Sequence, residues 1–390
     1  MAEPVLLISP YYPPRARVGA LRAAKFATYL PEFGFEPHIV SLDAGRPGES
    51  VHVLKTPVDR THKTSSSALG KGAANDRLSL LDRMVPVDTW LPVMWWNRAE
   101  VLEFAKQRKI RLVWSTGDPW SGHLLASSVA QALDVPWIAD WRDPWSLCKV
   151  RNLGRPRWTR RMDAAVERRW MSQATHNTFT AEETMRRYVE AYGVDASTIY
   201  NAFDQEEISA GEPVPAGDRV ELVFFGRFRE LSPAEPVIRM VAACKDPARV
   251  RVVSFGSLPE ADVRLAETLG VAECFVTEAP VPYTQAASRL RRAHILLLST
   301  DPRRDDIIPA KLWDYLPIGR PILSLAPNPE VDRLLAATGT GVGGDPVARL
   351  NAYLDQPSSL RHTPDVDLIR TYSARSATSD LASLIRRLIP

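Results

Sequence analysis

The sequence has little cysteine, no long apolar run and little net charge, and each absence excludes a class of protein. Its three cysteines, Cys148, Cys244 and Cys274, are too scattered for a disulfide framework or a zinc site. No apolar stretch reaches the roughly 20 residues that a membrane-spanning helix needs. The formal net charge is only +3, which does not indicate a nucleic-acid partner. The N-terminus has no basic region before its apolar run, so we expect no signal peptide. We expect a cytoplasmic protein, with the inner face of the membrane as the alternative location.

The composition indicates a globular protein with more than one core. Hydrophobic residues make up 45% of the 390 residues and charged residues 24%, as in ordinary folded proteins. A chain of this length exceeds the usual size of one domain. We therefore expect two domains, residues 1–205 and 206–372, separated by the linker 211–218 (GEPVPAGD).

Short apolar segments alternate with amphipathic segments in both blocks, a pattern that predicts parallel sheets covered by helices. The fold class is therefore α/β, with two doubly wound Rossmann-like domains facing one another across a cleft. The polar stretch 61–76 is predicted to be a loop, and the last helix, within 373–390, can pack back on the first domain. The expected strands are 5–9, 38–42, 112–115, 136–139, 175–178 and 197–200, then 221–225, 250–254, 273–277, 295–298 and 321–325.

The segment 305–325 (DDIIPAKLWDYLPIGRPILSL) predicts a loop, a helix, a turn and a buried strand. Pro309 suits a helix start and Gly319 a helix end. We expect the helix to carry an acidic pair, Asp306 and Asp314, with Lys311 between them. A helix that opens at the carboxyl edge of a parallel sheet can bind a phosphate, and a carboxylate in it can bind ribose hydroxyls. The alternative is an amphipathic surface helix with solvated charges.

Several blocks in the same order resemble family-4 glycosyltransferases of the GT-B fold, over nearly the whole chain. They are PYYPPRARVGALRAAKFATYLPEFGFEPHIV, STGDPWSGHLLASSVAQALDVPWIADWRDPW, IYNAFD, LVFFGRF and IPAKLWDYLPIGRPIL. Ala202 in IYNAFD stands where the family usually has glycine. The dinucleotide fingerprint GxGxxG is absent after the first strand.

The resemblance implies retaining transfer of a sugar from a nucleotide-sugar donor, without a metal and without a tightly bound cofactor. The donor, a UDP-, GDP- or dTDP-sugar, is a co-substrate. Arg227, which follows Gly226, and Lys311 would neutralise its diphosphate. Asp314 would hold the ribose. Asp306, eight positions earlier, takes the place of the first acid of the family's paired glutamates, or it is a loop residue that only fits the spacing.

Three residues of the first domain are further candidates. Gly19 would let the first loop approach the donor phosphate, or it is simply the turn before a helix. His123 matches a histidine that the family places near the reacting sugar; the alternative is a partly buried capping residue. Asp140 can act as the base for the acceptor hydroxyl, or the cluster of Asp140, Arg142 and Asp143 forms structural ion pairs that shape a loop.

The sequence does not decide the class of acceptor, nor does it exclude functions other than glycosyl transfer. Polysaccharide, glycolipid and natural-product biosynthesis all supply suitable acceptors: a glycan, a lipid-linked or a small-molecule hydroxyl. A nucleotide-sugar epimerase is a second candidate, and a non-catalytic nucleotide-sugar-binding subunit is a third. The basic segment 151–170 suits peripheral contact with an anionic membrane, but its apolar stripe is thin, so we favour a solvated helix face.

Overall fold

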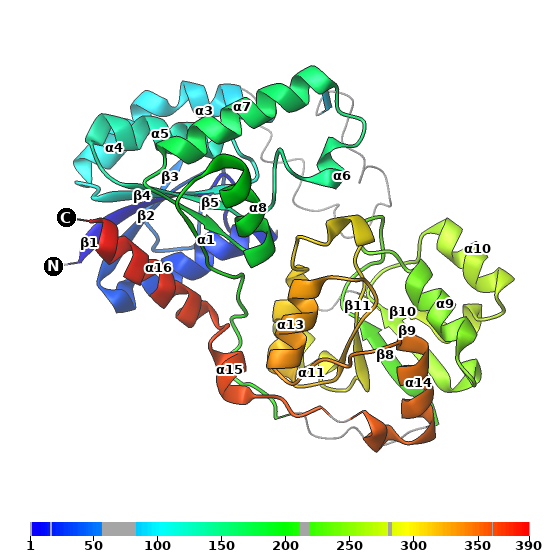
Figure 1. The fold of residues 1–390 in the computed structure, drawn as a ribbon. Coiled ribbons are helices and arrows are strands. Elements are labelled where there is room, and N and C mark those ends of the chain that lie inside the picture. Colours follow the sequence, from blue (N-terminus) through cyan, green and yellow to red (C-terminus); the bar gives the residue numbers. More distant parts are fainter. Residues whose placement is uncertain are drawn as a thin grey trace. The chain divides into compact units, whose positions relative to one another are not determined.

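The computed structural model describes residues 2–15, 18–56, 83–210, 218–279, 283–360 and 362–389. The chain divides into two compact units, one formed by Met1–Asp204 with Ser373–Pro390 and the other by Gln205–Tyr372. Figure 1 shows that each unit contains its own sheet. The loop expected at 61–76, and the linker apart from residue 218, lie outside the described residues.

The first unit is built on a seven-stranded parallel sheet with the order β3-β2-β1-β4-β5-β6-β7. The order reverses between β1 and β4, and ligands of such sheets bind beyond the carboxyl ends of the strands at this switch point. The strands are β1 (Glu3–Ile8), β2 (Phe35–Ser41), β3 (Val51–Val53), β4 (Leu112–Gly117), β5 (Trp137–Trp141), β6 (His176–Phe179) and β7 (Ala196–Thr198).

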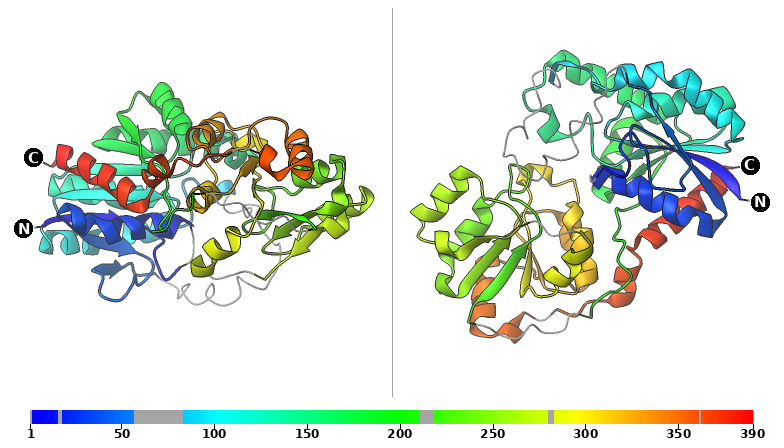
Figure 2. Two further views of the ribbon diagram at one scale, coloured as in Figure 1. Left: turned by 90° about the horizontal axis from the view of Figure 1, so that it is seen from below. Right: turned by 180° about the vertical axis from the view of Figure 1, so that it is seen from behind.

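Helices cover both faces of this sheet (Figure 1, Figure 2). Alternate residues of β1 explain why: Leu6 and Ile8 belong to one apolar cluster, whereas Val5 and Leu7 belong to another on the opposite face. The last helix packs against α1 on the second of these faces. The helices are α1 (Val18–Tyr29), α3 (Leu91–Trp96), α4 (Arg98–Gln107), α5 (Gly122–Leu133), α6 (Lys149–Asn152), α7 (Arg157–Gln173), α8 (Glu182–Tyr192) and α16 (Ala374–Leu388).

The second unit repeats this topology with a five-stranded parallel sheet in the order β10-β9-β8-β11-β12. Its switch point lies between β8 and β11. The strands are β8 (Val220–Phe224), β9 (Val250–Ser254), β10 (Phe275–Thr277), β11 (Ile295–Leu298) and β12 (Ile322–Ser324). The helices are α9 (Glu235–Ala243), α10 (Glu260–Thr268), α11 (Tyr283–Leu290), α12 (Ala310–Tyr315), α13 (Pro329–Ala337), α14 (Pro346–Asp355) and α15 (Val366–Arg370).

The predicted α/β class with two doubly wound sheets is confirmed. One strand is not among those expected from the sequence: Val51–Val53 forms the edge strand β3. This strand has only three residues, and it pairs with β2 alone. So short a segment has no period that distinguishes it from a loop.

Candidate functional site

In the second unit, the loop after β8 brings a glycine and an arginine to the switch point. Gly226 has φ +122, a conformation that side chains rarely adopt. A Cβ on Gly226 would lie 3.3 Å from Lys311 Cε, so the glycine backbone packs directly against the lysine side chain. Arg227 follows and is exposed, and its stem lies against Gly256 in the loop after β9. The structure therefore brings together three of the expected site residues: Gly226, Arg227 and Lys311.

Lys311 is a half-buried cation in the first turn of α12. Its ammonium lies 4.6 Å from the centre of the Phe224 ring. Burial, reinforced by the neighbouring positive charge of Arg229, lowers the pKa of Lys311 to about 8, and Asp314 only partly opposes this. Arg229 was not expected from the sequence. It follows Gly226 by only three residues, and this position in the chain is the signal that could have identified it as a site residue.

The cations of this loop and of α12 form no salt bridge with a described residue. Arg227, Arg229 and Lys311 all lack one, whereas Arg239, Arg264 and Arg370 of the same unit each pair with a carboxylate. Positive charges that converge without counter-ions repel one another, and binding an anion relieves that repulsion. The arrangement is suited to a diphosphate.

Tyr315 holds α12 against the sheet at this point. Its hydroxyl accepts a hydrogen bond from the backbone N–H of Phe225 at 2.8 Å and donates one to the carbonyl of Leu297 at 3.2 Å. These two bonds join α12 to the loop after β8 and to β11, on either side of the switch point. A third hydrogen bond, from Phe255 N–H to the carbonyl of Gly226, joins the loop after β9 to the loop after β8. The sequence analysis missed Tyr315, because its partners are distant in the chain.

The two acidic candidates lie in different elements, which corrects one expectation. Asp314 is on α12, one turn after Lys311, but Asp306 lies in the turn before the helix. The helix cannot extend back to Asp306, because Pro309 disfavours a helical conformation of the preceding residue. Its end at Gly319, with φ +68, follows a short 3-10 turn, Leu316–Ile318. Asp306 is buried and Asp314 half-buried, and both have polar contacts.

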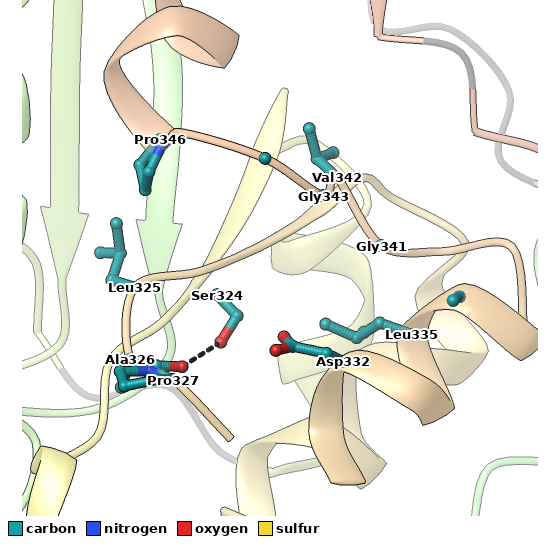
Figure 3. Close-up of a pocket in the computed structure, with 12 residues that line it drawn as sticks. Ser324, Leu325, Ala326, Pro327, Asp332, Leu335, Gly341, Val342, Gly343 and Pro346 are labelled. Carbon is teal, nitrogen blue, oxygen red and sulfur yellow. Dashed lines mark hydrogen bonds between the residues drawn. The ribbon is translucent and has the colours of Figure 1, made fainter. Parts of the chain in front are cut away.

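A pocket of about 510 Å³ lies beyond the carboxyl end of β12 (Figure 3). The side chains of Ser324 and Asp332 point into it. No residue that lines it is basic, so it is not built for a phosphate. The lining residues are Ser324, Leu325, Ala326, Pro327, Asp332, Leu335, Ala336, Gly341, Val342, Gly343, Gly344 and Pro346.

In the first unit, Asp140 is fully buried at the end of β5, and both its oxygens are occupied. Arg22 donates two hydrogen bonds to it, at 2.8 and 3.0 Å, and the hydroxyls of Thr116 and Thr178 donate one each at 2.8 Å. Arg22 also donates to the backbone carbonyl of Ile199. These bonds tie α1 to three neighbouring strands. The geometry favours the structural ion pair over the base, with Arg22 as the partner that the sequence analysis missed.

His123 is fully buried in the first turn of α5. Its Nδ1 lies 2.8 Å from the Ser115 hydroxyl, which in turn accepts a hydrogen bond from the Trp137 indole. Nε2 has no hydrogen-bond partner among the described residues and faces Gly117, at the end of β4. Burial lowers the pKa of His123 to about 3, so the ring is neutral near pH 7. It can therefore donate or accept one hydrogen bond, but it cannot supply a proton as imidazolium.

Gly19 lies in the first turn of α1, where it packs against a side chain. A Cβ at this position would lie 1.9 Å from a guanidinium nitrogen of Arg142. Arg142 is buried and forms an ion pair with Asp118 at 2.8 Å. The guanidinium of Arg142 thus occupies the space that a side chain at position 19 would need. Residues 16 and 17, in the loop before it, lie outside the described residues.

Solved structures show which known fold the two units share. A sucrose-phosphate synthase from Thermosynechococcus elongatus has a TM-score of 0.72 at 12% identity, with 99% of each chain covered. HepE from Anabaena, solved in complex with UDP and glucose, has a TM-score of 0.66 at 12% identity over all of both chains. WaaG, a glycosyltransferase involved in lipopolysaccharide biosynthesis, has a TM-score of 0.61 at 12% identity, covering 98% of this chain and 99% of its own. At these identities the likeness shows the fold, which is GT-B.

The sequence itself matches a family model. The chain matches no curated protein sequence. No helix among the described residues is long and apolar enough to span a membrane. The model of Glycosyltransferase Family 4 matches residues 20–207, which include Arg22, His123 and Asp140. Family and fold together support glycosyl transfer as the activity. The match to Glycosyltransferase Family 4 covers residues 20–207, just under half of the chain, and together with the GT-B fold it is consistent with a family-4 glycosyltransferase.

Proposed function

We propose that this protein is a hexosyltransferase that moves a sugar from a nucleotide-sugar donor to an acceptor hydroxyl, with retention of the anomeric configuration. One observation carries the proposal: at the switch point of the second sheet, Lys311 packs against Gly226 and feels the positive charge of Arg229, Arg227 follows Gly226 in the same loop, and none of these cations forms a salt bridge with a described residue. Cleavage of the bond between the sugar and the diphosphate develops negative charge on the leaving oxygen. Fixed cations stabilise that charge more than they stabilise the donor.

We assign the donor to the second unit and the acceptor to the first. Asp314 lies one turn from Lys311 and can accept hydrogen bonds from the ribose hydroxyls of the donor. We assign Asp306, in the turn before α12, as the other acid of this site. UDP is the first nucleotide to test, because HepE was solved with UDP and glucose. GDP and dTDP are the alternatives.

The first unit contributes the surroundings of the acceptor. We propose that Nε2 of His123, which is buried and has no hydrogen-bond partner among the described residues, faces the acceptor side of the site, and that Asp140 with Arg22 fixes the strand ends beside it. The two oxygens of Asp140 are already bonded, so it is not placed as a nucleophile. The proton of the acceptor hydroxyl then passes to an oxygen of the departing diphosphate as the new C–O bond forms. We propose a cell-surface glycan, a glycolipid or a secondary metabolite as acceptor, and a cytoplasmic location with peripheral contact at the membrane.

Calorimetric titration with UDP, GDP, dTDP and ADP tests the donor site. We expect one nucleotide to bind, and Lys311→Ala to weaken its binding by roughly 10-fold to 100-fold, the usual effect of losing a charged hydrogen bond. The matched control is Lys245→Ala on the same unit, since Lys245 already pairs with Asp355. If Lys311→Ala and Lys245→Ala bind the nucleotide with equal affinity, the donor does not bind at Lys311. The anomeric configuration of the product, read by NMR, tests retention.

A further inference from the structure

The outward side of α7 carries positive charge without negative charge. Its five exposed charged residues are all arginines, at positions 157, 160, 161, 168 and 169. The two acids of the helix, Asp163 and Glu167, are buried. None of the five arginines forms an ion pair with a described residue. The helix lies beside α5 in the layer that covers one face of the first sheet (Figure 1).

The buried acids are bound by groups inside the unit. Asp163 accepts hydrogen bonds from the Arg155 side chain at 2.6 Å and from Val87 N–H at 2.8 Å. Glu167 accepts one from the Tyr188 hydroxyl at 2.8 Å. Neither carboxylate can therefore compensate the arginines on the other side of the helix. The exposed arginines are therefore available to bind an anionic partner outside this unit.

Large apolar side chains share the exposed side of α7. Trp158 and Met162 are each 48% exposed and, being four residues apart, lie next to one another on the helix surface. Along the helix, Arg157, Arg161 and Arg168 form one row, and Trp158, Met162 and Arg169 form the row beside it, because residues three, four and seven apart align. Leu153, just before the helix, and Met84 are exposed as well. Met84 is next to Val85, whose carbonyl accepts a hydrogen bond from Arg155.

We propose that this surface, the exposed side of α7 with Leu153 and Met84, docks on a bilayer that contains anionic phospholipid. Arginine binds phosphate groups in a planar, bidentate manner, and tryptophan prefers the boundary between headgroups and acyl chains. A helix with a basic face and an exposed apolar row lies in the plane of that boundary. The inference rests on the membrane contact proposed above, and it is independent of the donor site.

The apolar row distinguishes a bilayer from a nucleic acid. A polyanion would contact the arginines but would leave Trp158 and Met162 in water. A bilayer takes up both kinds of side chain at the same depth. The net charge of only +3 also means that attraction to an anionic surface must come from this local concentration of arginine.

Co-sedimentation of the full chain with vesicles tests the proposal. We expect sedimentation with vesicles of equal parts phosphatidylcholine and phosphatidylglycerol, and none with phosphatidylcholine alone. The triple variant Arg157→Gln, Arg161→Gln, Arg168→Gln should bind about a hundredfold more weakly, at about fivefold for each arginine. A double variant, Trp158→Ser with Met162→Ser, should lose binding at high salt, where the apolar contribution remains.

The control removes the same charge from paired positions. Arg186→Gln, Arg239→Gln and Arg264→Gln together also take the formal net charge from +3 to zero, but these arginines pair with Glu183, Glu235 and Glu260. We expect this variant to bind vesicles as the natural chain does. Equal loss in both triple variants would show an effect of net charge alone and would overturn the assignment to α7.

Further readouts keep the outcomes separate. Urea unfolding of each variant, followed by circular dichroism, checks that the first unit, which contains α7, is folded, and nucleotide titration checks the second unit. Loss of vesicle binding with both readouts unchanged concerns the surface only. Brominated lipid should quench the fluorescence of the natural chain more than that of Trp158→Phe. Absence of sedimentation at low salt, or retention on immobilised DNA without any binding to vesicles, would refute the proposal.

Discussion

The buried lysine of the donor site predicts that nucleotide binding depends on pH in a specific way. The pKa of Lys311 is lowered to about 8 by burial and by Arg229. A bound diphosphate favours the ammonium form, so it should raise that pKa towards or above the ordinary value near 10.4. The nucleotide therefore binds best below pH 8, where Lys311 is already protonated. Its affinity should fall as the pH rises through 8.

The magnitude follows from the protonated fraction of the free protein. With a pKa of about 8, this fraction is about nine-tenths at pH 7 and about one-tenth at pH 9, so Kd should rise about tenfold, or about 1.4 kcal/mol. At pH 8, binding should take up about half a proton per nucleotide. Calorimetry in two buffers of different ionisation enthalpy measures this uptake directly.

Lys311→Arg is the matched control, because a guanidinium keeps its charge throughout this range. The variant should show no proton uptake at pH 8, and any pH dependence left in it belongs to the ligand. If the natural chain and Lys311→Arg respond identically between pH 7 and 9, Lys311 does not contact the diphosphate, and the reasoning from its burial is refuted.

Three further predictions concern the residues around the two switch points. Asp140→Asn leaves the buried guanidinium of Arg22 without its counter-ion and should lower the free energy of unfolding by about 3 to 5 kcal/mol in urea titrations; a change below about 1 kcal/mol would contradict the structural role. His123 has a pKa of about 3 in the folded state, far below its value near 6.5 in the unfolded state, so the unfolded state binds more protons between these values. The natural chain should therefore lose about 2 kcal/mol of stability between pH 7 and pH 5 that His123→Leu does not lose, as measured by denaturant titration at each pH. Tyr315→Phe leaves the buried N–H of Phe225 without its acceptor and should lower the free energy of unfolding by about 1 to 3 kcal/mol. It should also weaken nucleotide binding. An unchanged calorimetric affinity would show that this hydrogen bond does not support the nucleotide site.

Local patterns explain which elements the sequence predicted well. Each predicted strand of the second block has a counterpart, because short apolar runs between turn residues are typical of strands buried on both faces. Pro309 and Gly319 correctly mark the two ends of the segment that contains α12, since one lacks an N–H and the other adopts positive φ. Asp306 was placed on that helix wrongly, because the acidic spacing was weighed above the effect of Pro309 on the residue before it.

Contacts between distant residues could not be predicted in the same way. Arg22 and Asp140 are 118 residues apart, and nothing near Arg22 distinguishes it from Lys25, the other basic residue of α1. The close approach of Gly19 to Arg142, and of Gly226 to Lys311, likewise depends on which loops meet at one sheet edge. The roles of His123, Asp140 and the donor residues remain proposals that the experiments above decide.

By itself, the sequence determined the order of strands and helices, the division into two doubly wound sheets and the resemblance to the family. Those properties follow from apolar periodicity, from proline and glycine, and from motifs of adjacent residues, all of which act over a few residues. Only the tertiary structure decided that Asp140 is enclosed by four hydrogen bonds, that Lys311 lies near Arg229 with no salt bridge to a described residue, and that α7 turns its arginines and Trp158 outward. The physical reason is that burial and charge pairing are properties of folded neighbours, which the order of residues along a chain does not specify.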